Sequence, residues 1–457
     1  MNFKQLTFCF SIVFFVAFYS YGFQKENEIR YKGIERTLGI LHSSSKENPK
    51  ELSVLFYGQS IIGGMKPVIL IDSLEKTFPY TTIDFKQKAI GGFTVPLLIK
   101  TAEHDLFHEN PDLIIFHAYE GIKDGLLDSL VRRIREKMTS EILLLNHHYV
   151  WSTPRSHLKF VNESHDLDSK EIEKIAKKYQ CGFLDVRRYW RAYLKHNNIK
   201  ANKLVGNTVK PDVHPNAKGN KLLRQIILSK LRSKPKSIYN QENDELRTDI
   251  LIDDESKQIK TEFVGNRLEL FMDEQEEKTP IVVEVLIDKK KPSTFREFYY
   301  VTRPSKGFKS HMPAIKRVSL GPTLPREEDW TITITDIDRV NKTFIYSLYG
   351  SLTGFDGSGH SDLNFVSNSN RIHIEKGDFH IFNIEDIVEK NTPQNFKIKF
   401  SVKTHTKDTI VIPHYKSKCV LYHSRLVGNH ELELNILKGD RKIKKLIAFK
   451  PFLSNNE

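Results

Sequence analysis

Short apolar runs alternate with amphipathic helical patterns between Leu52 and Leu231, and this alternation constrains the fold more than any other feature of the sequence. The strand-like runs are bounded by turn-forming or charged residues, and they are Val54–Tyr57, Thr82–Phe85, Asp112–Phe116, Glu141–Asn146 and Gly182–Val186. The helical patterns between them are Asp124–Met138, Ser169–Tyr179 and Lys218–Leu231. The alternation predicts an α/β domain, in which helices cover both faces of a parallel sheet and the site lies at the carboxyl ends of the strands.

A polar segment from about Ser233 to Thr248 is followed by a region in which strands dominate. Its predicted strands are rich in Val, Ile, Phe and Thr, and they are Arg267–Met272, Ile281–Ile287, Trp330–Thr335, Thr343–Leu348, Arg371–Ile374, Phe396–Val402, Thr409–Ile412, Val420–His423 and His430–Ile436. They predict an all-β, jelly-roll-like sandwich, with two small β units in tandem as the alternative. Because 457 residues exceed what one core usually supports, we expect two domains, at residues 24–236 and 237–457.

The first 23 residues have the layout of a secretory signal peptide: a short positive start, an apolar core and small residues for cleavage. We therefore expect an exported protein, periplasmic or extracellular, with an uncleaved N-terminal anchor as the alternative. No later stretch has the apolar length of a transmembrane helix. Cys181 and Cys419 lie in strand-like runs, which favours buried thiols over a disulfide.

The formal net charge of +13 favours anionic partners such as an acidic polysaccharide. Nucleic acid is the competing partner, but the basic residues are spread out and export removes most nucleic-acid partners. A solvated basic surface without a specific partner is the third option.

Ser60 follows the first strand in Gly58-Gln59-Ser60 and precedes a possible helix start, which places its hydroxyl at the active edge of the sheet. The simplest alternative is a turn that ends a buried strand. A serine nucleophile needs a base, and the best one is His214, which lies in a loop between Pro211 and Pro215 before the last helix. Asp212 is the acidic neighbour that would orient the imidazole.

Two further motifs lie between these residues, Ala89-Ile90-Gly91-Gly92 and Pro111-Asp112-Leu113-Ile114-Ile115-Phe116. The motifs occur in the order found in the SGNH (GDSL) hydrolase superfamily. The segment from about residue 50 to residue 232 therefore resembles that superfamily. The sequences of Phe56–Ile61, Ala89–Phe93 and Thr101–Leu106 are similar to those of bacterial, polysaccharide-associated esterases in this superfamily. The resemblance implies a flavodoxin-like sheet, a Ser60 nucleophile and a His214 base, with no metal and no organic cofactor. It also implies an oxyanion hole made by the N–H groups of Ser60 and Gly92.

The chain departs from the family pattern at three places. The acidic residue before the serine is Gln59, which is tolerable because that position is not the nucleophile. The family's oxyanion asparagine is missing, since this chain reads His117-Ala118-Tyr119-Glu120-Gly121, so His117, Tyr119 or the Gly121 backbone must replace that donor. Asp212 lies two residues before His214, whereas the family spacing is three.

Further polar residues are expected around the substrate. Glu120 reads as a substrate contact or a surface charge, and Asn146, His147 and His148 as a polar rim at the end of the fourth strand. No carboxylate or third histidine lies at ligand spacing near His147 and His148, which disfavours a metal site. In the β region, Gly354–Asp362 reads as a Gly-rich hairpin, with a calcium loop as the alternative.

The sequence thus predicts an exported serine esterase that removes O-acetyl groups from a polysaccharide. Its partner would be an acylated polysaccharide or oligosaccharide, with an anionic chain as one option, and not nucleic acid. A lipase-type or thioesterase-type member of the superfamily is one alternative. A catalytically idle glycan-binding protein is the other, because the asparagine is missing and the aspartate is shifted.

Overall fold

The computed structural model describes residues 33–206, 210–236, 246–252, 257–272, 280–413, 418–439 and 443–453. The predicted signal peptide lies outside these residues. The chain forms two units by contact, of which the first comprises residues 1–89, 111–118 and 141–239 and the second residues 90–110, 119–140 and 240–457. The domain boundary at residue 236 stays a prediction.

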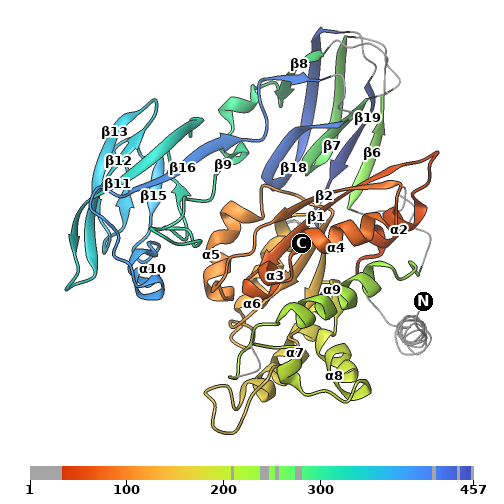
Figure 1. Ribbon diagram of the computed structural model, residues 1–457. Helices are drawn as coiled ribbons and strands as arrows, with labels where there is room; N and C mark the ends of the chain where they lie inside the picture. Colours follow the sequence, from red (N-terminus) through yellow and green to blue (C-terminus); the bar gives the residue numbers. More distant parts are fainter. Residues whose placement is uncertain are drawn as a thin grey trace. The chain divides into compact units, whose positions relative to one another are not determined.

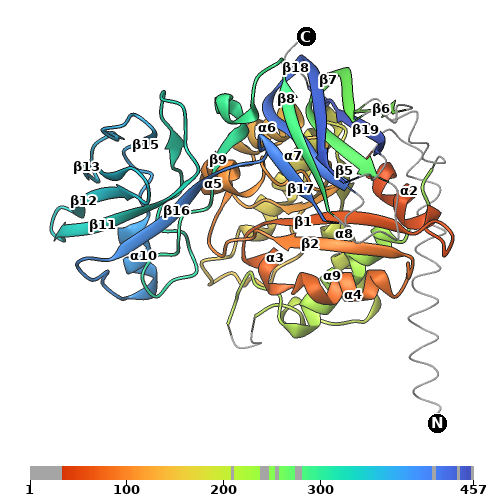
Figure 2. The same ribbon diagram turned by 90° about the horizontal axis from the view of Figure 1, so that it is seen from above.

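The first unit contains a parallel sheet in the order β2-β1-β3-β4-β5, which is the flavodoxin-like order that we predicted. Its strands are β1 (Lys50–Gly58), β2 (Thr81–Gln87), β3 (Leu113–His117), β4 (Glu141–Leu145) and β5 (Gly182–Leu184). Figures 1 and 2 show β1 and β2 side by side, with α3 (Ser60–Gly64) following β1 directly. The predicted α/β class is therefore confirmed.

Helices bury the apolar side chains of these strands. The other helices of this unit are α2 (Glu35–Ser43), α4 (Pro67–Glu75), α7 (Val161–Lys178), α8 (Val186–His196) and α9 (Ala217–Leu231). Phe56 of β1, Leu143 of β4, Trp190 of α8 and Ile227 of α9 are buried in one core. Within the described residues, none of the helices is both long and apolar enough to cross a membrane.

The second unit is mostly antiparallel sheet. Its strands are β6 (Arg247–Leu251), β7 (Gln258–Met272), β8 (Ile281–Ile287), β9 (Tyr299–Val301), β10 (Ser319–Leu320), β11 (Glu328–Asp338), β12 (Thr343–Gly350), β13 (Gly354–His360), β14 (Phe365–Val366), β15 (Ile372–Ile374), β16 (Lys397–Thr404), β17 (Thr409–Ile412), β18 (Lys418–Lys438) and β19 (Ile443–Phe449). Its helices are α5 (Val95–Asp105), α6 (Leu126–Lys137) and α10 (Ile381–Val388). The predicted β architecture of the C-terminal region is confirmed, and α10 is a helix within it that we did not predict.

The β region has two hydrophobic cores. One lies on the six-stranded sheet β17-β8-β18-β7-β19-β6 and includes Val283 and Leu434. The other joins the five-stranded sheet β13-β12-β11-β16-β9 to the three-stranded sheet β10-β15-β14, since Trp330 and Ile372 belong to the same core. The second core therefore lies between two sheets, as the predicted sandwich requires, and the six-stranded sheet has a core of its own.

Two details of the β region differ from the sequence reading. The strands predicted at Val420–His423 and His430–Ile436 are one long strand, β18, whose pairing shifts register between His423 and Gly428. Most of Gly354–Asp362 is strand β13, in which the buried Asp356 accepts hydrogen bonds from Ser369. These observations favour the predicted hairpin over the calcium-loop alternative.

Gly58, the last residue of β1, has no room for a side chain. Its φ is +134°, and an added Cβ would lie 2.4 Å from the carbonyl oxygen of His117 on β3. The contact is between two backbones of the same sheet, so relief requires the strands to separate. The Gly-Gln-Ser motif thus begins with a glycine because the two strands approach closely there.

We predict that Gly58→Ala lowers the free energy of unfolding by more than about 2 kcal/mol, since it adds both backbone strain and a steric clash. Gly64→Ala is the matched control, because its Cβ would lie 3.9 Å from the nearest atom, on Asn220, and alanine favours helix. Urea unfolding of both variants measures the difference. Equal losses in the two variants would contradict this account of Gly58.

Candidate active site

Ser60 is held at the start of α3 by the residue before it. Gln59 has extended backbone, and its side-chain Oε1 accepts the backbone N–H of Ile61 at 2.9 Å, which caps the helix. Ser60 is the first residue of α3, so its own N–H has no acceptor within the helix. The chain thus turns from strand to helix within one residue and presents Ser60 at the carboxyl end of β1.

The loop that carries His214 is fixed at several points. Gly206 N–H donates to the carbonyl of His214 at 2.8 Å, and the Nε2–H of His148 donates to the carbonyl of Val213 at 2.9 Å. Asn216 caps α9 by accepting the N–H groups of its first turn. Asn220 on that helix donates to the carbonyl of Pro215 at 2.9 Å. Both ends of this loop are therefore held by backbone contacts and by α9.

Ser60, His214 and Asp212 form a hydrogen-bonded chain. Ser60 Oγ lies 3.0 Å from His214 Nε2, and His214 Nδ1 lies 2.9 Å from Asp212 Oδ1. A carboxylate only accepts, so the imidazole proton is on Nδ1 and the Nε2 lone pair faces the serine hydroxyl. The His214 side chain is 54% exposed, which leaves it accessible to a ligand and to water.

Asp212 reaches His214 despite the two-residue spacing because its side chain folds back on the loop. Besides the imidazole, Oδ1 accepts the N–H groups of Val213 at 2.6 Å and of His214 at 3.1 Å. Partial burial acts to raise the pKa of Asp212, but the hydrogen bonds from the His214 ring and from these two N–H groups outweigh it and hold that pKa below its usual range. An aspartate that remains ionised is suited to hold the Nδ1–H tautomer of His214.

A second chain leads from Ser60 into the interior through Gln59, His117 and His147. Because the N–H of Ile61 can only donate, Gln59 turns Oε1 toward it and Nε2 toward His117 Nδ1, at 2.9 Å. The His117 proton is therefore on Nε2, which faces His147 Nδ1 at 3.2 Å. His147 in turn directs Nε2 toward Asp168 Oδ2 at 3.7 Å.

This second chain offers the Ser60 hydroxyl a competing acceptor. Gln59 Oε1 lies 2.9 Å from Ser60 Oγ, and His214 Nε2 lies 3.0 Å from it. The hydroxyl has one proton, so it can donate to only one of the two acceptors at a time. The pair of acceptors holds Oγ in the rotamer that reaches His214.

The histidines behind Ser60 are neutral at physiological pH. Burial, followed by the neighbouring His147, lowers the pKa of His117 well below its usual value. Burial is also the largest cause for His147 and His148, whose pKa values fall to about 3, and for His165, whose pKa falls to about 2. Neutral imidazoles with one donor and one acceptor each are what the second chain requires.

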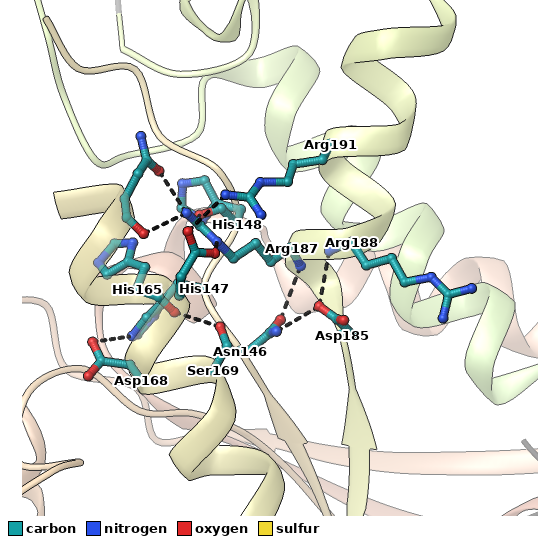
Figure 3. A network of polar contacts seen from close by, with 12 residues as sticks. Asn146, His147, His148, His165, Asp168, Ser169, Asp185, Arg187, Arg188 and Arg191 are labelled. Atoms are coloured by element: carbon teal, nitrogen blue, oxygen red, sulfur yellow. Dashed lines mark hydrogen bonds and ion pairs between the residues drawn. The ribbon is translucent and has the colours of Figure 1, made fainter. Parts of the chain in front are cut away.

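Arg187 braces the segment that follows β4 (Figure 3). The guanidinium is 3% exposed, and it donates to Asp166 at 2.6 Å, to the carbonyl of His148 at 3.0 Å and to that of Asn162 at 2.8 Å. Its backbone N–H donates to Asn146 Oδ1 at 3.1 Å. Because His148 holds the carbonyl of Val213, Arg187 supports the His214 loop from behind.

The predicted polar rim lies in the interior instead. Asn146 is 1% exposed, and its Nδ2 donates to Asp185 Oδ1 at 2.7 Å while its oxygen accepts the Arg187 N–H (Figure 3). His147 is also 1% exposed and His148 3%. The expectation that these residues line a pocket is therefore corrected: they support the site from inside.

The prediction that His117 donates to the oxyanion or contacts the substrate is corrected in the same way. His117 is 2% exposed, and both ring nitrogens face Gln59 and His147, so it is not placed to donate to an oxyanion or to contact a substrate. No sequence pattern marked the roles of Arg187, Asp166 and His165. The signal that could have been used is Asp185, which caps α8 two residues before Arg187.

The other predicted residues lie in the second unit. Gly92 has φ +77°, a conformation that favours glycine, and an added Cβ would lie 2.9 Å from Met312 Cε, the movable end of a flexible side chain. The carbonyl of Tyr119 accepts the N–H of Val95 at 2.9 Å, Glu120 is exposed with φ +55°, and Gly121 has φ +64°. Their roles beside Ser60 stay predictions.

Two cysteines lie within the described residues. Cys181 is a buried thiol as expected, and Cys419 is only partly buried. Over the ranges that the structure describes, His, Cys, Asp and Glu side chains form no group of three or more suited to a metal ion.

Comparison with known proteins gives structural likenesses alone. No family model matches the chain, and no curated protein matches it. The acetylxylan esterase Axe2 from Geobacillus stearothermophilus is 19% identical with a TM-score of 0.34, over 41% of this chain and 96% of that one. LAE5, an alpha/beta hydrolase enzyme from the metagenome of Lake Arreo, Spain, is 17% identical with a TM-score of 0.34, over 42% of this chain and 97% of that one. Values this low leave the function to be argued from the site itself.

Acidification should destabilise the protein through the buried histidines. The unfolded chain binds a proton on each histidine below about pH 6.5, whereas the folded state resists protonation until its lowered pKa is reached, so stability is lost as the pH falls below 6.5. At pH 5.5 we expect a loss of about 1.4 kcal/mol for each such histidine relative to pH 7.5, measured by urea unfolding.

His148→Gln is the variant that isolates one proton, because glutamine retains a donor for the carbonyl of Val213 but does not titrate. Its stability should vary less with pH than that of the wild type. His157→Gln is the control for the substitution itself, because His157 is exposed. If His148→Gln and the wild type showed the same pH dependence, neutral burial of His148 would be ruled out.

Proposed function

We propose that the protein is an exported serine esterase that removes O-acetyl groups from a polysaccharide through an acyl-enzyme intermediate. The observation that carries the proposal is the hydrogen-bonded chain from Ser60 through His214 to Asp212, with distances of 3.0 and 2.9 Å, at a solvent-accessible position. Without its base a serine hydroxyl is a poor nucleophile, and this arrangement supplies that base.

In the first half of the proposed reaction, Ser60 Oγ attacks the carbonyl carbon of the ester while His214 Nε2 takes its proton. Asp212 stabilises the imidazolium that forms, and the oxyanion faces the Ser60 N–H at the start of α3. His214 then gives the proton to the departing sugar oxygen. The C–O bond to the sugar breaks, and the acetyl group stays on Ser60.

In the second half, water attacks the acetyl-serine and gives its proton to His214. Collapse of the second tetrahedral intermediate returns this proton to Ser60 Oγ and releases acetate. The residues of the chain supply the nucleophile, the base and the charge stabilisation, so the proposed steps are complete without a further reactant other than water.

The polysaccharide substrate rests on the sequence. The predicted signal peptide, the net charge of +13 and the resemblance to polysaccharide-associated esterases support it. A preference for long acyl chains would instead support a lipase-type hydrolase, and absence of ester hydrolysis would support a glycan-binding protein.

We predict that the purified chain hydrolyses an aryl acetate and releases acetate from acetylated polysaccharides. Ser60→Ala should lower kcat by at least about a thousandfold, because it removes the nucleophile. Ser73→Ala is the control, since that hydroxyl is bonded to the carbonyl of Ile69 on α4. Equal activity in wild type and Ser60→Ala would refute a serine mechanism, and activity that rises with acyl length would refute acetate as the natural acyl group.

The chain through Gln59 predicts a coupling between two buried residues. His117→Phe removes the acceptor of Gln59 Nε2 and should lower kcat about tenfold with little change in KM, because Ser60 Oγ is then less well positioned. His117→Asn keeps an acceptor near the position of Nδ1 and should restore most of the rate.

A double-mutant cycle separates positioning from general damage. In a Gln59→Ala background, His117→Phe should have no further effect on kcat, since the amide through which it acts is gone. An equal loss in both backgrounds would show that His117 acts through the fold and not through Gln59.

A further inference from the structure

One face of the sheet β13-β12-β11-β16-β9 carries an ordered arrangement of exposed side chains. Alternate residues of β11, β12 and β16 point inward, as Trp330, Tyr346 and Phe400 do in the core. The residues between them point outward and are exposed or half-buried. Figure 1 shows β11, β12, β13 and β16 side by side, and strand pairing places their outward residues in rows across the sheet.

The first row combines aromatic rings with a hydroxyl and a positive charge. Phe355 pairs with Tyr349, Tyr349 with Thr331, and Thr331 with Lys399. The two rings are 53% and 47% exposed, and their centroids lie 5.3 Å apart at 58°. Two such rings on an open sheet face form an apolar platform with one polar tip, the tyrosine hydroxyl.

The second row is polar. Ser358 pairs with Ser347, Ser347 with Thr333, and Thr333 with Lys397. The hydroxyls of Ser358 and Ser347 lie 3.1 Å apart. The row therefore offers hydroxyl donors and acceptors next to the aromatic platform and ends, like the first row, in a lysine.

The charge of this face is positive at one end. Lys397, Lys399 and Lys403 are exposed on β16. The acidic side chains near them are Asp329, whose Oδ1 accepts the Ser401 hydroxyl at 2.6 Å, and Glu327, whose Oε1 accepts the Thr404 N–H at 3.1 Å beside Lys403. Lys397 and Lys399, which pair with Thr333 and Thr331, leave positive charge at the end of both rows.

We propose that this face of the sheet binds an anionic polysaccharide chain that runs across the strands from β13 to β16. The apolar face of a sugar ring would stack on Tyr349 and Phe355, the sugar hydroxyls would bond to the serines and threonines, and an acidic sugar group would lie at Lys397 and Lys399. Four strands span about 14 Å, which accommodates a short oligosaccharide. That the ligand is a polysaccharide rests on the proposed function, whereas its negative charge rests on the lysines.

Affinity electrophoresis of the full mature chain tests the proposal, with polygalacturonate or alginate as the anionic probe and dextran as the neutral one. The anionic probes should retard the wild type and dextran should not. The double variants Tyr349→Ala/Phe355→Ala and Lys397→Glu/Lys399→Glu should each raise the Kd at least about tenfold. The controls are Phe160→Ala, which removes a ring that is 67% exposed, and Lys46→Glu/Lys76→Glu, which makes the same charge change elsewhere.

Each outcome decides for or against the proposal. An equal loss in the two lysine pairs would show general charge attraction and overturn it, as would full binding by the aromatic variant. If the wild type self-associates and Tyr349→Ala/Phe355→Ala does not, the face binds a second copy of the chain, which overturns the proposal. Hydrolysis of an aryl acetate by the wild type, followed in parallel, separates the two proposals. A wild type that hydrolyses the ester but does not bind the anionic probes overturns this proposal alone, and one that binds them without hydrolysing the ester overturns the esterase alone.

Discussion

Much of the candidate site depends on a single oxygen atom, Asp212 Oδ1. It accepts the Nδ1–H of His214 and the N–H groups of Val213 and His214. These bonds bend the loop tightly enough for a residue two positions away to orient the imidazole. A helical turn would have needed three residues for the same contact. The fixed ring then presents Nε2 to Ser60, which sets the direction of the proposed proton transfer.

The interior behind the site is polar but carries few titrating groups at physiological pH. His117, His147, His148 and His165 are kept neutral by burial, and the Arg187 charge is balanced by Asp166 and by carbonyl oxygens. Such networks are costly when partly satisfied and specify a geometry when each direction is determined. Here the donor-only N–H of Ile61 sets the direction of the chain from Gln59 through His117 to His147.

The sequence predicted the parallel sheet well because buried strands are recognisable as apolar runs between turn signals. It also predicted that Ser60 and His214 would meet, because their places in the chain order put both residues at the carboxyl edge of such a sheet. It did not predict that Asn146, His147 and His117 are buried, because a polar residue at a strand end looks the same whether solvent or another segment covers it. It divided β18 in two at Gly428, where a pairing irregularity resembles a turn. The helices α2, α4, α5, α8 and α10 were not assigned.

The most direct test of the central claim is to trap the intermediate. The purified protein would be mixed with an aryl acetate, quenched in acid within the first turnover, digested and analysed by mass spectrometry. The account predicts one acetyl group on the peptide that contains Ser60, lost in Ser60→Ala and accumulating in a variant of His214 that slows deacylation. Turnover without acetylation of Ser60, or acetylation on another residue, would contradict it.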